Sequence, residues 1–195
     1  MRTQQRDATR EQIVKAALQA IAESGFDGVS TRAIAARANV SQGLLSYHFK
    51  SKDALWRASA DHLFALADEA ITDALAHREF DDPREQCRQL IRQLVFFSAA
   101  HPEFVRFMVE QGKDDNERSR WLADTHLSPI YKRFSELPWD GPNVDFPHLF
   151  YSVAGAASFI FAVADECKLV TGKDPRANSM AERHANFLAE LIVPS

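Results

Sequence analysis

The sequence predicts an all-helical (all-α) fold of about nine helices, with three helices at the N-terminus and a larger helical part behind them. Apolar residues recur at spacings of three and four along most of the 195 residues, as on one face of a helix. Capping residues, Pro and Gly separate these stretches. No segment alternates apolar and polar residues between turns, so no sheet is expected.

The first helix is expected over residues 8–24, where it meets a glycine, and two very short helices joined by a tight corner follow it. Ser30 or Thr31 can cap the first short helix by accepting a free backbone N–H, and Ser41 can cap the second. Asn39 is the expected corner, because Asn tolerates a left-handed backbone better than most residues other than Gly.

This succession of helices has the layout of a helix-turn-helix reader of duplex DNA. Leu45 and Phe49 lie four residues apart and are expected to face inward against Ile34 and Val40. The rest of the second short helix then faces outward, where Gln can pair with an adenine edge and Leu can pack on a thymine methyl. The residues predicted to contact DNA are Arg32, Ser41, Gln42, Gly43, Leu44, Ser46, Tyr47, His48 and Lys52.

Residues 10–55 resemble the DNA-binding domain of the TetR-type (AcrR-like) transcriptional regulators. The resemblance implies DNA contacts at those positions except Ser41, a ligand site in the middle of the chain and dimerisation through the last two long helices. Two positions depart from the family pattern: Asn39 replaces the usual glycine, and Ser46 stands where an aromatic residue is common. The resemblance rests on Ile13, Ala16-Ala17, Gly25-Phe26, Thr31-Arg32-Ala33-Ile34-Ala35, Val40-Ser41-Gln42-Gly43-Leu44-Leu45, Tyr47-His48-Phe49 and Lys50-Ser51-Lys52-Asp53-Ala54-Leu55.

Charge is distributed unevenly along the chain. Residues 1–60 carry nine Lys and Arg against five Asp and Glu, a net +4, whereas residues 61–195 carry fourteen against twenty-two, a net −8. The whole-chain charge of −4 argues against indiscriminate binding of nucleic acid. A basic head on an acidic body directs a duplex to one end. Arg2, Arg6 and Arg10 either reach phosphates of that duplex or form a solvated tail.

The remaining helices are delimited by Pro and Gly. Residues 52–77 are expected to link a DNA-binding domain, residues 1–51, to an effector-binding and dimerisation domain, residues 52–195. A linker is expected at residues 138–142. Further helices are expected from 83 to 100, from 102 to 112, through 121–134 after a charged loop or first turn at 114–120, from 146 to 172, and from 175 to 193.

The last two helices form either an intramolecular core pair or the interface of a homodimer. Small residues at 154–158 allow another helix backbone to come close. A dimer is favoured because a two-fold pair reads two half-sites of a palindromic operator. The predicted interface residues are Ala154, Ala157, Ser158, Phe161, Phe187 and Leu191.

The middle of the chain is rich in aromatic residues, which either pack as ordinary core or line a cavity for a small molecule. A largely apolar effector, aromatic or acyl, is expected, and the scarcity of Lys and Arg within the apolar faces only mildly disfavours a highly anionic one. His101 and His148 are further polar candidates. The predicted effector-binding residues are Phe97, Phe104, Phe107, Met108, Trp121, His126, Tyr131 and Phe150.

Together these features predict a ligand-responsive transcriptional regulator, a repressor released from its operator by effector, with activation by ligand left open. No cofactor, metal or enzymatic activity is expected, because no Glu-x-x-His or His-x-x-x-His pair suits a site inside a helical bundle. The alternatives are a helical-bundle enzyme and a protein-binding adaptor that uses the same surface.

Two further features indicate where the protein acts. Cys87 and Cys167 match neither a metal-ligand spacing nor a disulfide framework, so buried free thiols are expected, with a redox switch as the alternative. The N-terminus lacks the apolar segment of a signal peptide, and the longest apolar stretch, residues 149–164, is short for a membrane span. A soluble, cytoplasmic protein is expected.

Overall fold

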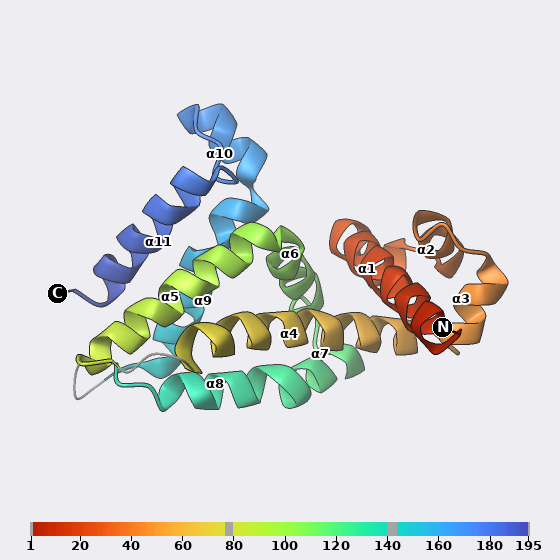
Figure 1. Ribbon diagram of the computed structural model, residues 1–195, viewed down its shortest axis with the longest axis horizontal. Helices are drawn as coiled ribbons and strands as arrows, with labels where there is room; N and C mark the ends of the chain where they lie inside the picture. The colour runs from red at the N-terminus through yellow and green to blue at the C-terminus, as the bar shows by residue number, and fades with distance from the viewer. Residues whose placement is uncertain (1, 77–79, 140–143, 195) are drawn as a thin grey trace.

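The computed structural model describes residues 2–76, 80–139 and 144–194, and all regular elements within these ranges are helical, as predicted. Figure 1 shows an elongated molecule with α1, α2 and α3 at one end, α4 running from them along the body, and α10 standing away from the body. The elements are α1 (Arg2–Gly28), α2 (Thr31–Arg37), α3 (Gln42–His48), α4 (Lys52–Ala76), α5 (Pro83–Ala100), α6 (Pro102–Gln111), α7 (Glu117–Leu122), the π-helical turn η1 (Ala123–Leu127), α8 (Ser128–Ser135), α9 (Phe146–Ala162), α10 (Ala164–Thr171) and α11 (Asn178–Ile192).

Two apolar cores hold these helices together. The first combines the N-terminal helices and α4 with Phe107 of α6 and Leu122 of α7, both at most 2% exposed. The second lies in the body, where Ile91 of α5, Val153 of α9 and Leu188 of α11 pack together. Because α6 and α7 share the first core, the N-terminal helices are packed against the body rather than merely tethered to it.

The first helix is longer than predicted. It begins at Arg2 rather than at residue 8, and a kink rather than an end occurs at Gly25, after which one more turn leads to Gly28. Gly25 has φ +73°, a backbone conformation that L side chains rarely adopt, and a Cβ there would lie 3.2 Å from Oε2 of Glu110 in α6. The kink therefore lies where α1 meets the body.

The corner between α2 and α3 forms as predicted. Ser30, not Thr31, caps α2, since its Oγ accepts the backbone N–H of Ala33 at 3.1 Å. Asn39 has φ +52°, and it is the sole non-glycine residue with positive φ within the described ranges. The short polar side chain of Asn makes this conformation less costly than it is for most residues.

The predicted helix from 146 to 172 is broken in two. α9 ends at Ala162, and Val163, with φ −110° and ψ 34°, leads into α10 at a bend of 75°. Gly172 ends α10 in the left-handed conformation, as predicted. The final helix begins at Asn178 rather than at residue 175, because Asp174 accepts the backbone N–H of Arg176 at 3.1 Å in a separate turn.

The predicted helix through residues 121–134 is also composite. Asn116 caps its first part, α7, by accepting the backbone N–H groups of Arg118 and Ser119. A π-helical turn follows at Ala123–Leu127 before α8 begins. Such turns are often associated with functional sites.

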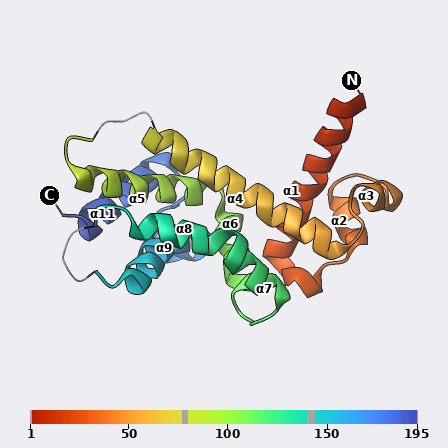
Figure 2. The same cartoon turned by 90° about the horizontal axis from the view of Figure 1, so that it is seen from below.

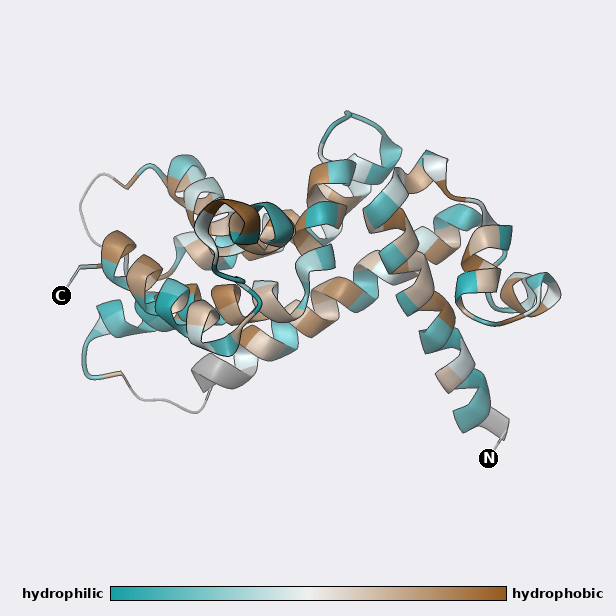
Figure 3. Ribbon diagram, turned by 90° about the horizontal axis from the view of Figure 1, so that it is seen from above, coloured by the Kyte–Doolittle hydropathy of each residue, from teal (hydrophilic) through white to brown (hydrophobic). Residues whose placement is uncertain are grey.

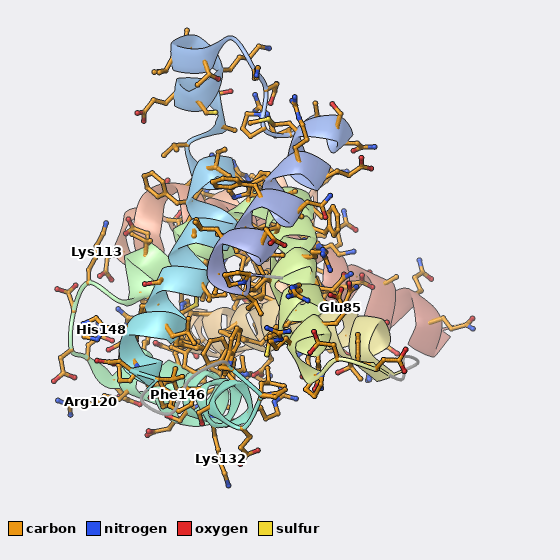
Figure 4. The ribbon with its side chains drawn as sticks, turned by 90° about the vertical axis from the view of Figure 1, so that its left-hand side faces the viewer. Glu85, Lys113, Arg120, Lys132, Phe146 and His148 are labelled. Carbon is orange, nitrogen blue, oxygen red and sulfur yellow. The ribbon has the colours of Figure 1, made fainter. Side chains whose placement is uncertain are left out.

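A buried arginine ties the end of the chain to α5. Arg88 is 7% exposed, and its guanidinium donates to the backbone carbonyls of Val193 at 2.8 Å and Pro194 at 2.7 Å. It also donates to Glu85 at 3.2 Å. Figure 4 labels Glu85, which lies at the start of α5. These bonds hold the end of α11 against α5 in the second core.

Two predicted features extend beyond the described residues. His77, the predicted end of the helix from residue 52, and residues 140–142 of the predicted linker lie outside them. Over the described ranges, no single helix has the length and hydropathy of a membrane span. α9 and α10 meet both criteria only when they are counted as one segment, and a bend of 75° separates them.

Candidate nucleic-acid interface

Helix α3 is anchored by a small number of buried contacts. Ser41 caps it as predicted, since its Oγ accepts the backbone N–H of Leu44 at 3.1 Å. Leu45 is 2% exposed and Phe49 is 6% exposed, and both pack with Ile34 in the first core. The inward side of α3 is therefore fixed, and its other side is left to solvent.

All the residues predicted to contact DNA are exposed or half-buried. Tyr47 is 64% exposed and Leu44 is 39% exposed, which is unusual for large apolar or aromatic side chains in a folded domain. Gly43, which precedes Leu44, is also exposed. The structure groups the α3 members of the set on one short helix; the other members are Arg32 at the start of α2, Ser41 at the cap and Lys52 at the start of α4.

The side chain of Gln42 is oriented by its neighbour in α2. Its Nε2 donates to Oγ1 of Thr31 at 3.2 Å, which joins the first residue of α3 to the first residue of α2. This contact was not predicted from the sequence, because the two residues are eleven positions apart and meet through the corner.

Lys52 is held over an aromatic ring. Its Nζ lies 4.3 Å from the ring centroid of Phe26, and the guanidinium of Arg118 lies 3.8 Å from the same centroid. A cation over an aromatic face is attracted by the negative potential of the ring. The ammonium group of Lys52 is thus positioned by Phe26 of α1, whose ring also contacts Arg118 of the body. The residue as a whole stays half-exposed.

Basic residues of α1 lie beside α3. The guanidinium of Arg10 lies 5.2 Å from the ring centroid of Phe49. Burial, followed by the nearby charges of Arg6 and Arg10, lowers the pKa of His48. Arg6 and Arg10 belong to an ordered helix, not to an irregular tail, and the side chain of Arg2 lies outside what the structure describes.

The predicted effector residues fall into two aromatic clusters. In the first, which also includes His101, the ring of His126 is stacked on Phe64, with ring centroids 4.4 Å apart, and its Nε2 lies 3.0 Å from Oδ1 of Asp61. The second contains Tyr131 and Phe150, packed with Phe134. The predicted members of the first cluster are Phe97, Phe104, Phe107, Trp121 and His126, with Met108 packed against the same core.

Two members of the first cluster were missed by the sequence analysis. Trp56 and Phe64 belong to α4, the helix for which the sequence predicted only a link between the two domains. Trp56 is fully buried, and among the described residues its indole N–H has no hydrogen-bond partner. A buried donor without an acceptor is costly, so this position is unusual within the cluster.

Two open grooves lie elsewhere on the surface. One, of about 400 Å³, runs between α1 and the end of α2, where Gln12, Lys15 and Arg37 line it. The other, of about 370 Å³, lies at the start of α9 and is lined by Pro147, His148, Tyr151 and Ser152, with His148 visible at that end in Figure 4. Neither groove is lined by the eight predicted effector residues.

The cysteines and the metal-ligating residue types form no common site in the described ranges. Cys87 is buried, as predicted, but Cys167, a free thiol, is half-exposed, which corrects the prediction for that residue. Within the same ranges, no group of three or more His, Cys, Asp or Glu residues is placed to hold a metal ion.

The structure divides the predicted dimer residues. Ala154 is exposed, and Phe187 and Leu191 are each 63% exposed, as an interface between two chains requires. Ala157 and Phe161 are each 1% exposed and pack in the second core of the same chain, and Ser158 is 7% exposed; this burial argues against their predicted place in a dimer interface.

Other exposed apolar residues extend this face. Tyr151 and Phe159 of α9 are 73% and 63% exposed, and Leu169 and Val170 of α10 are 87% and 77% exposed. Figure 3 shows α10 nearest the viewer, with hydrophobic and hydrophilic residues interspersed along it. α9 contacts both α10 and α11, and we call the exposed apolar residues of these three helices the α9–α11 face.

Sequence comparisons identify the N-terminal part of the chain. Residues 13–58 match the family model described as "Bacterial regulatory proteins, tetR family". The chain is 30% identical over 111 residues to the HTH-type transcriptional repressor NicS of Pseudomonas putida, covering 57% of this chain and 51% of NicS. It is 35% identical over 123 residues to the HTH-type transcriptional regulator BetI of Yersinia pestis, covering 63% of this chain and 58% of BetI. The matches therefore span a little more than half the length of these relatives.

Solved structures share the whole fold. A TetR-like transcriptional regulator from Rhodococcus sp. RHA1 has a TM-score of 0.68 at 21% identity, covering 94% of this chain and 93% of that chain. The fatty acid degradation regulator FadR from Bacillus halodurans has a TM-score of 0.68 at 18% identity, with coverage of 92% and 97%. AibR in complex with isovaleryl coenzyme A and operator DNA has a TM-score of 0.64 at 18% identity, with coverage of 95% and 98%. At these identities the likeness establishes the fold.

Proposed function

We propose that this chain, whose residues 13–58 belong to the TetR family of bacterial regulatory proteins, is a ligand-responsive transcriptional regulator that binds a palindromic DNA operator. The observation that carries the proposal is the outward side of α3. Gln42, Leu44 and Tyr47 are exposed there while Leu45 and Phe49 hold the helix in the core. A helix that presents hydrogen-bonding and apolar groups in this way is suited to the major groove.

The basic residues around α3 support the same proposal. Arg32 and Lys52 flank α3 at the starts of α2 and α4, where they can bind phosphates on either side of the groove. The net charge of +4 over residues 1–60, against −8 over the rest, directs a duplex toward this end of the molecule.

A homodimer is part of the proposal. The α9–α11 face leaves six large apolar side chains more than half exposed, an unusual property for a monomer. A second copy on this face covers them and places two α3 helices for two half-sites. In this arrangement residues 1–51 act as the DNA-binding domain and residues 52–195 as the effector-binding and dimerisation domain.

The proposed effector is small and largely apolar, and the first aromatic cluster is its proposed site. Trp56 and Phe64 of α4 meet Trp121 and His126 of α7 and η1 there, so a ligand among these rings would displace α4, which carries Lys52 at its first residue. The coupling cannot exceed the difference in the effector's affinity for the two arrangements. We propose repression relieved by ligand, in the cytoplasm, with no catalytic step.

Selection of bound duplexes from a random pool tests the proposal directly. The expected result is enrichment of an inverted repeat whose half-site centres are about 34–36 Å apart, or a multiple of that spacing. Apolar acyl and aromatic compounds are the first effector probes, and isovaleryl coenzyme A, the ligand in the AibR structure, is the anionic comparison. Enrichment of no sequence, even at low salt, would contradict the proposal, and capture of a protein at the α3 surface without DNA binding would favour an adaptor.

A further inference from the structure

Thr31 and Gln42 are joined across the corner by a side-chain hydrogen bond, with Nε2 of Gln42 donating to Oγ1 of Thr31 at 3.2 Å. Each is the first residue of its helix, and the capping is done by the residues before them, Ser30 and Ser41. Their side chains are therefore not used in capping. We infer that Thr31 is a positioning residue that orients the Gln42 carboxamide for adenine, an inference that rests on the proposed function.

The chemistry of the carboxamide defines what it can read. A Gln side chain has two N–H donors and one carbonyl acceptor. One N–H is engaged by Thr31, so the outer edge of Gln42 presents the remaining N–H beside Oε1. Adenine offers the complementary pair in the major groove, with N7 as acceptor and N6–H as donor. Guanine offers two acceptors, N7 and O6, and can use only the donor of this edge.

The hydroxyl of Thr31 also determines which way the carboxamide faces. A hydroxyl can accept from Nε2 or donate to Oε1, and the second arrangement would turn the amide around. When a DNA phosphate accepts a hydrogen bond from the hydroxyl of Thr31, that hydroxyl can only accept from Gln42. The arrangement with Nε2 of Gln42 toward Thr31 is then selected. Contact with the DNA backbone and recognition of the base are then linked through one oxygen atom.

A simpler role for Thr31 makes a different prediction. If Thr31 only contacts a phosphate, its removal weakens binding to every sequence alike, because phosphate contacts carry no sequence information. If it positions Gln42, its removal also changes the preference among bases at one operator position. Base preference at that position therefore separates the two roles, whereas affinity alone does not.

The experiment begins with the operator selected by the wild-type protein. The position read by residue 42 is identified as the one whose preference is lost in Gln42→Ala. Binding of Thr31→Val, which removes the hydroxyl at constant shape, is then measured on four operators that differ only at that position. Thr31→Ser retains the hydroxyl and is the matched control, and thermal unfolding checks that all variants are folded.

In the wild-type protein we expect adenine to be preferred over guanine at this position. Thr31→Val should reduce that preference about threefold to tenfold, the range expected for one net hydrogen bond. Thr31→Ser should keep it within about twofold, and Thr31→Val should have no effect on base preference in the Gln42→Ala background.

Three outcomes would overturn the inference. A preference for guanine at that position contradicts the proposed edge of Gln42. An equal loss of affinity for all four bases in Thr31→Val shows that Thr31 is a phosphate contact alone. Selection of no sequence by the wild-type protein removes the proposed function itself, and the inference with it.

Discussion

The guanidinium of Arg118 lies 3.8 Å from the ring centroid of Phe26, so α7 of the body contacts the end of α1 directly. Figure 2 shows α7 beside this end of α1. Arg118 also lies 3.7 Å from a carboxylate oxygen of Asp53 in the first turn of α4. Lys52 lies over the same ring of Phe26, so a shift of α7 would change the surroundings of Lys52, a proposed phosphate contact.

Removal of Arg118 should therefore destabilise the protein. Arg118→Ala is expected to lower the free energy of unfolding by about 1 kcal/mol, the scale of a partly buried cation–π contact. Urea denaturation measures this, and the double variant with Phe26→Leu should show a coupling of the same order. Arg120→Ala, on the same helix, is the control, because its pair with Asp115 is solvent-exposed. Equal effects of the two arginine variants would show that the contact with Phe26 contributes nothing.

Lys52→Ala should weaken binding to all duplexes alike. Loss of one phosphate contact reduces the slope of log affinity against log salt by about one unit. Titrations of the selected operator and of an unrelated duplex at several salt concentrations measure this. Lys132→Ala is the control, since Lys132 belongs to α8 of the body, where its exposed side chain projects outward (Figure 4). A slope that stays at the wild-type value would place Lys52 away from the backbone of the duplex.

Phe187→Glu should separate the proposed dimer. It places a charge on the α9–α11 face in both chains, and loss of two buried aromatic side chains should raise the dimer dissociation constant about a hundredfold or more. Sedimentation velocity over a range of concentrations measures this. Val109→Glu is the control, because Val109 of α6 is similarly exposed, at 58%, but lies outside this face. A monomeric wild-type protein, or equal behaviour of both variants, would exclude the proposed interface.

Stability should fall as the pH is lowered from about 7.5 to 5.5. Burial, followed by the charge of Lys15, holds the pKa of His62 below its ordinary value of 6.5. The unfolded chain therefore binds a proton at a higher pH than the folded chain does. The contribution of His62 to stability is present in full above the pKa of the unfolded chain, and it is lost as the pH falls toward the lower pKa of the folded chain. His62→Gln should flatten the dependence of the melting temperature on pH, with the residual slope reflecting His48, whose pKa is lowered too. An unchanged slope in this variant would contradict the assignment.

Gly25→Ala should destabilise the contact between α1 and α6. At φ +73° and ψ 168°, a conformation essentially limited to glycine, an alanine would cost about 1–3 kcal/mol, and its Cβ would lie 3.2 Å from Glu110. Thermal and urea unfolding measure the loss. Gly28→Ala is the control, because its Cβ would meet only Ser24, at an ordinary distance of 3.4 Å. Equal stability of the two variants would mean that the kink does not need glycine.

Local chemistry made the N-terminal helices predictable from sequence. The caps at Ser30 and Ser41 and the positive φ at Asn39 each depend on one residue and its immediate neighbours. The α3 surface followed from the same reasoning, because Leu45 and Phe49 fix which side is buried. Whether that surface contacts DNA stays a prediction.

The features that the sequence did not predict depend on tertiary packing. No glycine or proline marks the break at Val163, although Asp165 and Glu166 in the first turn after it, where acidic residues are favoured, were an available signal. Ala157 and Ser158 were assigned to the dimer because small residues suit either kind of close helix contact. Which contact they make depends on the position of α11, and that position is not encoded locally.

The arrangement of tryptophans provides the protein with a built-in optical reporter. Trp56 and Trp121, with ring centroids 5.4 Å apart, lie where α4 meets α7, whereas Trp139 packs on Phe134 in the separate second core. Emission from the first pair should respond to any molecule that parts these two helices, and Trp139→Phe would remove the background. Compounds could then be screened by fluorescence before any target sequence is known.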